Sequence, residues 1–204
     1  AQSFGSTYKG KKSCNLSTVG CTSFFPSKPL GCYGDGGAIF TNNEFLAKAM
    51  SEIRIHGQNK RYIHSRLGIN GRLDTIQAAI LLAKFKIFPD EILKRNKVGK
   101  QYTLRIKELQ SSIITPQIRS NCTTVYAQYS ILVDDREQLI GKFKKESIPT
   151  AVHYPVPLHL QLPFYNNKLN LPIAEGVAKK IVSLPMHPYL SVKDIEKVCQ
   201  ILAL

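Results

Sequence analysis

The chain has 204 residues, 43% of them hydrophobic, which is enough to bury the core of one domain or of two small ones. No run approaches the roughly 18 apolar residues that a membrane span needs, and residues 1–5 lack the charged and apolar regions of a signal peptide. The net charge of +14 favours anionic partners, which are nucleic acid, a membrane surface or phosphorylated small molecules.

The five cysteines are scattered and include no Cys-x-x-Cys pair, which argues against a zinc site or a disulfide framework and fits a reducing cytoplasm. The basic residues are dispersed among apolar ones, without a zinc finger or an aromatic RNA-binding motif. The net charge alone therefore does not identify which of these anionic partners the protein binds. The chain also starts without an initiator methionine, which leaves open that it is a fragment.

In chain order, residues 6–13 predict a basic hairpin or loop around Gly10. Two short apolar runs bounded by proline and glycine, Thr22–Phe25 and Ala38–Thr41, predict buried strands. The glycine-rich residues 34–37 between them predict a tight turn that needs positive φ angles.

Lys28 lies between the two predicted strands. Pro26 and Pro29 keep its segment out of a continuous helix, so a stiff loop or strand end presents the side chain. An amine held among apolar neighbours such as Phe24 and Leu30 could act as a nucleophile. Taken alone, the same pattern fits a solvated surface lysine beside a turn.

After these strands, apolar residues recur at helical spacing, and Asn42 or Asn43 is expected to cap the first predicted helix. A polar, basic loop is expected over residues 58–68, and Pro89 is expected to separate the second helix from the third. The predicted helices cover residues 44–55, 72–88 and 90–109.

The second half alternates predicted strands and helices, which suggests an open-faced α/β sandwich. Ser191 and Asp194 have the spacing of a capping box at the start of the last helix. We expect two domains, residues 1–110 and 111–204. The predicted elements of the second are strands Val125–Val133 and Thr150–Tyr154, a helix from Asp134 or Asp135 to Ser147, and helices over 172–182 and 191–203.

Several motifs in order along nearly all of the chain give it a family resemblance. They are Ser23-Phe-Phe-Pro-Ser-Lys28-Pro-Leu-Gly, Gly34-Asp-Gly-Gly, His56-Gly, Gly68-Ile-Asn70-Gly-Arg72-Leu-Asp74-Thr-Ile-Gln77, His153-Tyr-Pro-Val-Pro-Leu-His159 and Leu184-Pro-Met-His-Pro188. The chain resembles the pyridoxal 5′-phosphate (PLP)-dependent sugar aminotransferases of the DegT/DnrJ/EryC1/StrS group, without their N-terminal part. Within that group it is most similar to the enzymes that aminate UDP-2-acetamido-2-deoxy-3-oxo-glucuronate for surface polysaccharides.

The resemblance implies an α/β, aspartate-aminotransferase-like PLP fold (fold type I). Residues 1–110 would supply part of the large-domain sheet with connecting helices, and residues 111–204 the small C-terminal α/β domain. The implied reaction transfers an amino group from L-glutamate to a UDP-linked keto-sugar in the cytoplasm. Neither nucleic acid nor membrane insertion is expected.

The resemblance also assigns roles to residues. Lys28 matches the lysine that forms the Schiff base with PLP, and Ser23 the serine that hydrogen-bonds the cofactor phosphate. Gln2 matches the glutamine beside the pyridine ring. Asn70 matches the asparagine that reaches the phosphate of the partner subunit, which implies a homodimer with shared active sites.

Arg72, His153 and Tyr154 match or adjoin the positions that bind the sugar nucleotide, whereas His56, His159 and His187 are interpreted as structural. The family's aspartate that pairs with the pyridinium nitrogen would lie two residues before Ala1 and is absent from the sequence. An electron-withdrawing cofactor depends on that partner, so the chain could be an inactive fragment.

Three alternatives stay open. The first is an aminotransferase that acts at C4 of a UDP- or dTDP-4-keto-6-deoxy sugar. The second is a related sugar dehydratase, in which a histidine replaces the Schiff-base lysine, so Lys28 argues against it. The third is a non-catalytic basic module that binds nucleic acid or an anionic surface.

Overall fold

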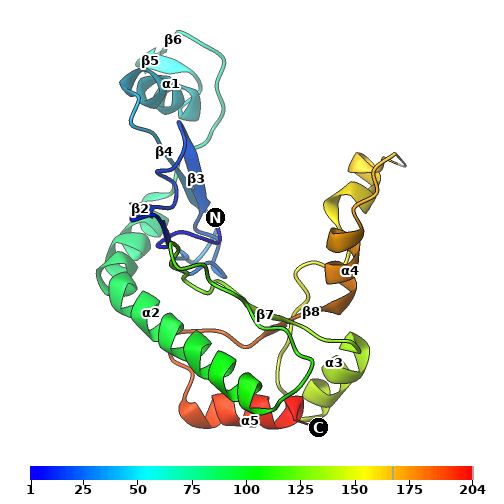
Figure 1. Cartoon of the computed structure of the whole chain (residues 1–204). Coiled ribbons are helices and arrows are strands. Elements are labelled where there is room, and N and C mark those ends of the chain that lie inside the picture. The colour runs from blue at the N-terminus through cyan, green and yellow to red at the C-terminus, as the bar shows by residue number, and fades with distance from the viewer. Residues whose placement is uncertain (167, 204) are drawn as a thin grey trace. The chain divides into compact units, whose positions relative to one another are not determined.

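The structure, a computed structural model, describes residues 1–166 and 168–203 (Figure 1). It divides into two compact units. The N-terminal unit comprises Ala1–Ile92 with Ile118–Ala127, and the C-terminal unit comprises Leu93–Gln117 with Gln128–Leu204. These units do not coincide with the expected domains 1–110 and 111–204, and that division stays a prediction. Among the described residues, no helix has both the length and the hydropathy to cross a membrane.

The N-terminal unit contains two antiparallel strand pairs before its first helix. The basic hairpin is formed as expected around Gly10, whose φ is +77°. In the second pair Thr22 lies opposite Ala38, and the side chain of Asn43 caps the helix by accepting from the Leu46 N–H at 3.0 Å. The elements are β1 (Thr7–Tyr8), β2 (Lys11–Lys12), β3 (Gly20–Ser23), β4 (Gly37–Phe40) and α1 (Glu44–Arg54).

The segment expected as a basic loop contains a further hairpin, β5 (Gln58–Lys60) with β6 (Ile63–His64), which lies beside α1 (Figure 1). A buried carboxylate on α1 holds the chain just after this hairpin: Glu52 accepts from Arg66 Nε at 2.6 Å and from the Ser65 hydroxyl at 3.2 Å. The prediction of a loop was wrong because the polar strands carry no apolar alternation that would reveal them.

The second and third predicted helices are one helix, α2 (Thr75–Glu108), with Pro89 inside it. The prediction that Pro89 ends a helix was therefore wrong. Proline removes one N–H donor from the helix, but its neighbours Phe88 and Ile92 both pack in the core of the N-terminal unit. Tertiary packing thus outweighs the local preference of proline for a break.

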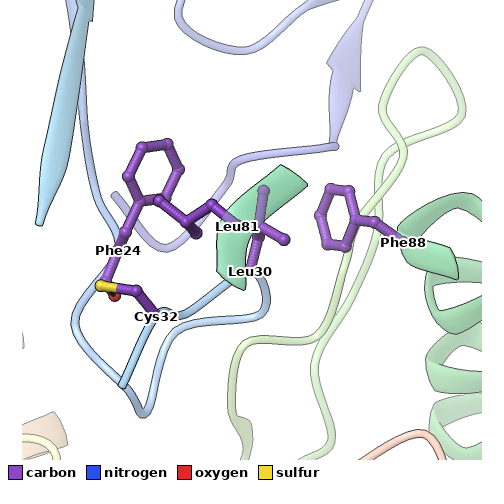
Figure 2. Packing of buried hydrophobic residues seen from close by; sticks show 5 residues of the cluster. All are labelled: Phe24, Leu30, Cys32, Leu81 and Phe88. Atoms are coloured by element: carbon purple, nitrogen blue, oxygen red, sulfur yellow. Dashed lines mark hydrogen bonds between the residues drawn. The ribbon is translucent and has the colours of Figure 1, made fainter. Parts of the chain in front are cut away.

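The core of the N-terminal unit joins the segment around Lys28 to the first part of α2. Figure 2 shows its five buried members, which are Phe24, Leu30, Cys32, Leu81 and Phe88. Phe4 lies edge-on to Phe24, with ring centroids 5.9 Å apart, and stacks on Phe88 at 5.8 Å. These contacts fix the two ends of the loop that carries Lys28.

The C-terminal unit is built on the antiparallel pair β7–β8, in which Tyr129 lies opposite Leu184. Isolated bridges add Ile114 beside β7 and Ala151 beside β8. Its elements are β7 (Tyr129–Leu132), α3 (Arg136–Lys145), the short 3-10 turns η1 (Leu158–Leu160) and η2 (Leu162–Phe164), α4 (Pro172–Lys180), β8 (Ile181–Leu184) and α5 (Val192–Leu202).

Both predicted caps are confirmed in this unit. The Asp135 side chain accepts from the Gln138 N–H at 2.9 Å, and Ser191 and Asp194 form the capping box of α5. The strand expected over Thr150–Tyr154 is reduced to the bridge at Ala151. The helix expected to reach residue 182 ends at Lys180, and β8, which the sequence did not reveal, follows directly.

Candidate active site

The loop that carries Lys28 follows β3 and is anchored on both sides. The Phe24 N–H donates to the Gly36 carbonyl, and the Cys32 N–H donates to the Phe24 carbonyl, each at 2.8 Å. Inside this frame the Lys28 N–H donates to the Phe25 carbonyl at 2.9 Å. The Lys28 side chain is half-buried, and its ammonium has no hydrogen-bond or ion-pair partner among the described residues.

Helix α2 holds the next part of this loop through two polar side chains. Gln77 Oε1 accepts from the Tyr33 N–H at 2.8 Å, and the Lys84 ammonium donates to the Gly31 carbonyl. Sequence reasoning did not assign a role to either residue. The available signal is their spacing, because residues 77, 81 and 84 lie on one face of a helix.

The glycine-rich turn was predicted for the wrong reason. None of Gly34, Gly36 and Gly37 has a positive φ. A Cβ on Gly37 would lie 2.8 Å from the Thr22 carbonyl oxygen, and one on Gly36 would lie 3.0 Å from Cys32 Sγ. Close approach of neighbouring chain segments, rather than backbone conformation, therefore favours glycine here.

Ser23 ends β3, and its Oγ accepts from the Phe25 N–H at 3.1 Å, so its own proton can serve another acceptor. The preceding residue, Thr22, has a buried hydroxyl without a partner among the described residues. Thr22 lines a cavity of about 1080 Å³ between β3, β4 and α1, together with Ile69 and Gly71. None of the predicted site residues lines this cavity.

The end of α1 positions the loop that contains Asn70 and Arg72. The Ile69 N–H donates to the Ile53 carbonyl at 2.9 Å, and the Gly71 N–H donates to the Arg54 carbonyl at 2.8 Å. Asn70 Oδ1 accepts from Arg72 Nε at 3.0 Å, and both side chains are exposed. The structure thus brings these two predicted residues together.

Gln2 lies in a turn at the start of the described chain and is half-buried. The neighbouring Ser3 carbonyl accepts from the Ser6 N–H and from the Ser13 hydroxyl. This turn is thereby held against the β1–β2 hairpin, but no hydrogen bond or ion pair within the described part of the chain joins Gln2 to Ser23 or Lys28.

His153 and Tyr154 line a cavity of about 610 Å³ in the C-terminal unit, whose other walls come from the 3-10 turns, α4 and the start of β8. Their rings lie edge-on with centroids 5.5 Å apart. His153 Nδ1 is 3.0 Å from the Ser183 hydroxyl oxygen, and Tyr154 is largely exposed. The lining is otherwise apolar, so these two residues supply its polar groups together with His159.

His159 is buried in the wall of this cavity, 3.1 Å through Nε2 from the Glu175 carboxylate on α4. The same carboxylate oxygen accepts from the Leu171 N–H at 3.3 Å. The hydrogen bond from His159, followed by that from Leu171, holds the pKa of Glu175 below its usual value. Glu175 thus fastens both ends of the segment between the two residues.

Because the pKa of Glu175 is lowered in the folded state, the carboxylate stabilises the fold when it is charged. This contribution is complete above about pH 5, since the ordinary pKa of glutamate is about 4.3, and it is lost as the pH falls through the lowered pKa. We expect Glu175→Gln to have a lower urea midpoint than the unsubstituted chain at pH 7. At acid pH the midpoints of the two should become similar. Glu146→Gln is the control, because Glu146 pairs with Lys197 at 4.0 Å between two exposed side chains. A constant difference between Glu175→Gln and the unsubstituted chain at all pH values would contradict the expectation.

Comparison with known proteins places these features in a family. The sequence is 55% identical over 199 residues to the UDP-2-acetamido-2-deoxy-3-oxo-D-glucuronate aminotransferase of Pseudomonas aeruginosa, covering 98% of this chain and 55% of that protein. It is 40% identical to the pleiotropic regulatory protein of Geobacillus stearothermophilus, covering 100% and 56%. The chain thus spans about half the length of the curated relatives it matches.

Solved structures agree with the fold. A DegT DnrJ EryC1 StrS aminotransferase from Brucella abortus matches with a TM-score of 0.93 at 40% identity, over 99% of this chain and 54% of that one. DesV of S. venezuelae, solved in complex with a ketimine intermediate, matches with a TM-score of 0.95 at 30% identity, over 100% and 55%. The expected α/β fold of PLP-dependent aminotransferases is confirmed. Since the family profile matches residues 1–203, the chain belongs to the DegT/DnrJ/EryC1/StrS aminotransferase family.

Proposed function

We propose that this chain is part of a PLP-dependent aminotransferase that moves an amino group from L-glutamate to a UDP-linked 3-keto uronic acid sugar. The observation that carries the proposal is Lys28, whose ammonium has no partner among the described residues. Its loop is anchored at the buried residues Phe24 and Cys32. The 55% identity to the P. aeruginosa enzyme supports the substrate class. For the present protein, the same proposal includes a role in surface-polysaccharide biosynthesis, a cytoplasmic location and a homodimeric state. It also includes the division into domains 1–110 and 111–204.

The groups present fit PLP in two respects. Lys28 offers an amine that has no competing partner within residues 1–166 and 168–203, and Ser23 keeps a hydroxyl proton for a phosphate oxygen because its Oγ is already an acceptor. When bound, PLP supplies a carbonyl that exchanges an amino group and a ring that withdraws electrons from the reacting carbon. Gln2 would hydrogen-bond beside that ring, and Asn70 would reach the phosphate of the partner subunit.

In this mechanism Lys28 has two tasks. Its Nζ would hold the cofactor through the carbonyl carbon, and the free amine would accept and return the proton at the α-carbon of the amino donor. Arg72, held by Asn70 at 3.0 Å, would bind an anionic group of the substrate. His153 and Tyr154 would bind the sugar nucleotide in the cavity of the C-terminal unit.

The names of several relatives favour amination at C3 over the C4 alternative. The proteins of P. aeruginosa and Acidithiobacillus ferrooxidans are named for 3-oxo and 3-dehydro sugars, and that of Aneurinibacillus thermoaerophilus for a 3-amino product. The basic, non-catalytic module is not proposed, because the nucleotide diphosphate gives the positive charge an anionic partner.

Borohydride trapping tests the role of Lys28. The purified chain is incubated with PLP and reduced, and the modified peptide is identified by mass spectrometry. We expect the adduct on Lys28 and its loss, together with the associated absorbance, in Lys28→Ala. Lys48→Ala, at an exposed lysine on α1, is the control and should trap PLP normally. Adduct on another lysine, equal trapping by Lys28→Ala, or no trapping at all would contradict the proposal that this chain's residues hold the cofactor.

A further inference from the structure

Two polar side chains on α2 lie on either side of the leucine that packs this helix against the loop of residues 24–32. Gln77, Leu81 and Lys84 follow one another at helical spacing, so all three lie on one face of α2. Leu81 belongs to the buried core together with Leu30 of the loop (Figure 2). Gln77 and Lys84, each about one turn away from Leu81, therefore reach the same stretch of chain.

Both side chains hold the end of this loop and the residues after it by direct contacts. The Lys84 ammonium donates to the Gly31 carbonyl and lies 5.6 Å from the centroid of the Tyr33 ring. Gln77 Oε1 accepts from the Tyr33 N–H at 2.8 Å, and a Cβ on Gly34 would come within 3.1 Å of Gln77 Nε2. The glycine thus leaves room for the amide, and α2 holds three neighbouring residues of the chain.

The hydrogen bond from Lys84 has no substitute in the part of the chain that the structure describes. Gly31 is buried, so its carbonyl oxygen requires a donor, and within residues 1–166 and 168–203 that donor is Lys84 alone. Lys84 in turn forms no ion pair with a carboxylate of these residues. Removal of its ammonium leaves the carbonyl unsatisfied, which favours movement of this segment toward water.

Such a movement reaches Lys28, because only Pro29 and Leu30 separate it from Gly31. Both of these residues are buried, and the proline ring fixes its own φ angle. The Lys28 N–H is also bonded to the Phe25 carbonyl at 2.9 Å. The backbone of Lys28 therefore has little freedom of its own, and its orientation depends on where Gly31 is held.

We propose that Lys84 and Gln77 are positioning residues that hold the Lys28 amine in the orientation needed for bond formation with a carbonyl carbon. The inference rests on the proposed function, in which Lys28 Nζ holds the cofactor. In that step a C–N bond forms, and the carbonyl oxygen leaves as water with the two protons of the neutral amine. Since Nζ must approach the carbon within a narrow range of directions, a loop that moves reacts more slowly although its amine is chemically unchanged.

Trapping rates at Lys28 test this inference. The chain is mixed with PLP and quenched with borohydride at successive times, which reduces the new C=N bond to a stable amine, and the Lys28 peptide is quantified by mass spectrometry. We expect Lys84→Met to lower the rate of adduct formation about 10- to 100-fold and Gln77→Leu to lower it as well. Lys84→Arg, which keeps the charge and a donor, should restore most of the rate. Lys86→Met, at an exposed lysine of the same helix, is the matched control and should react normally.

Two further measurements separate positioning from general loss of structure. Formaldehyde is small and needs no fixed approach, so its reductive labelling of Lys28 with cyanoborohydride should change less than about twofold in Lys84→Met. Amide hydrogen exchange is measured without any cofactor. It should become about fivefold faster at Cys32 in Lys84→Met and at Tyr33 in Gln77→Leu, as expected for the loss of one ordinary hydrogen bond.

The outcomes distinguish this inference from the proposed function. Normal PLP trapping in both Lys84→Met and Gln77→Leu, or equal losses with PLP and formaldehyde, would overturn the positioning role alone. Absence of any adduct in the unsubstituted chain would instead contradict the proposed function. Hydrogen exchange then still decides whether α2 holds the loop, and unchanged exchange in both variants would refute that. If Lys84→Met does not fold, Gln77→Leu decides by the same measurements.

Discussion

Replacement of Phe143 by alanine is expected to lower the free energy of unfolding of the C-terminal unit by about 3–5 kcal/mol. Phe143 lies on α3 and is fully buried, as are Ile131 of β7 and Val182 of β8. Deletion of its ring removes buried apolar surface and leaves a cavity that a close-packed core fills only in part. Urea denaturation followed by far-UV circular dichroism measures the loss.

Lys144→Ala is the control for Phe143→Ala, because Lys144 is the next residue on the same helix and is exposed. A surface change of this kind is expected to stay within about 0.5 kcal/mol. Equal midpoints for the two variants would show that α3 does not pack in this unit as described.

Gly57→Ala is expected to destabilise the N-terminal unit by about 2–4 kcal/mol, because it combines backbone strain with a steric clash. Gly57 has a φ of +75°, and a Cβ there would lie 1.8 Å from the Arg66 carbonyl oxygen. The chain around Arg66 must then move, which also disturbs its bond to Glu52. We expect faster amide hydrogen exchange over residues 58–72, the segment that carries Asn70 and Arg72.

Gly10→Ala separates the two causes. Gly10 has nearly the same φ, +77°, but a Cβ there meets nothing within 4 Å. It should therefore show only the strain of a left-handed alanine, about 1–2 kcal/mol. Similar losses in both glycine variants would contradict the clash at Gly57 as the main cause.

The features that the sequence predicted correctly depend on short-range chemistry. The caps at Asn43, Asp135 and Ser191 each join a side chain to an N–H three residues later, so the local sequence contains both partners. The hairpin around Gly10 is equally local. Such contacts form in nearly any tertiary setting.

The wrong secondary-structure predictions concern segments whose structure depends on contacts with residues distant in the sequence. The helix continues through Pro89 because Phe88 and Ile92 pack against the cluster that includes Phe24 and Leu30. An apolar run such as Ile181–Leu184 fits a helix end and a strand equally well until β7 is known to lie beside it.

The candidate active site shows the same difference between local features, which the sequence predicts, and long-range contacts, which it does not. Motif order drew attention to Lys28 and His153, but side chains that hold the Lys28 loop and the His153 ring lie far away in the sequence. Lys84 reaches the Gly31 carbonyl across 53 residues, and Ser183 reaches His153 across 30. A single sequence contains no signal that pairs such positions, so only the fold reveals them.

The two-stranded sheet of β3 and β4 has a consequence for how the chain behaves in solution. Within the described residues each strand pairs only with the other, and Ile39 and Phe40 on β4 are 56% and 37% exposed. Open strand edges with apolar side chains favour pairing between molecules. The net charge of +14 opposes this by mutual repulsion, which added salt screens. Colloidal stability is therefore greatest in dilute, low-salt solution and falls as ionic strength rises.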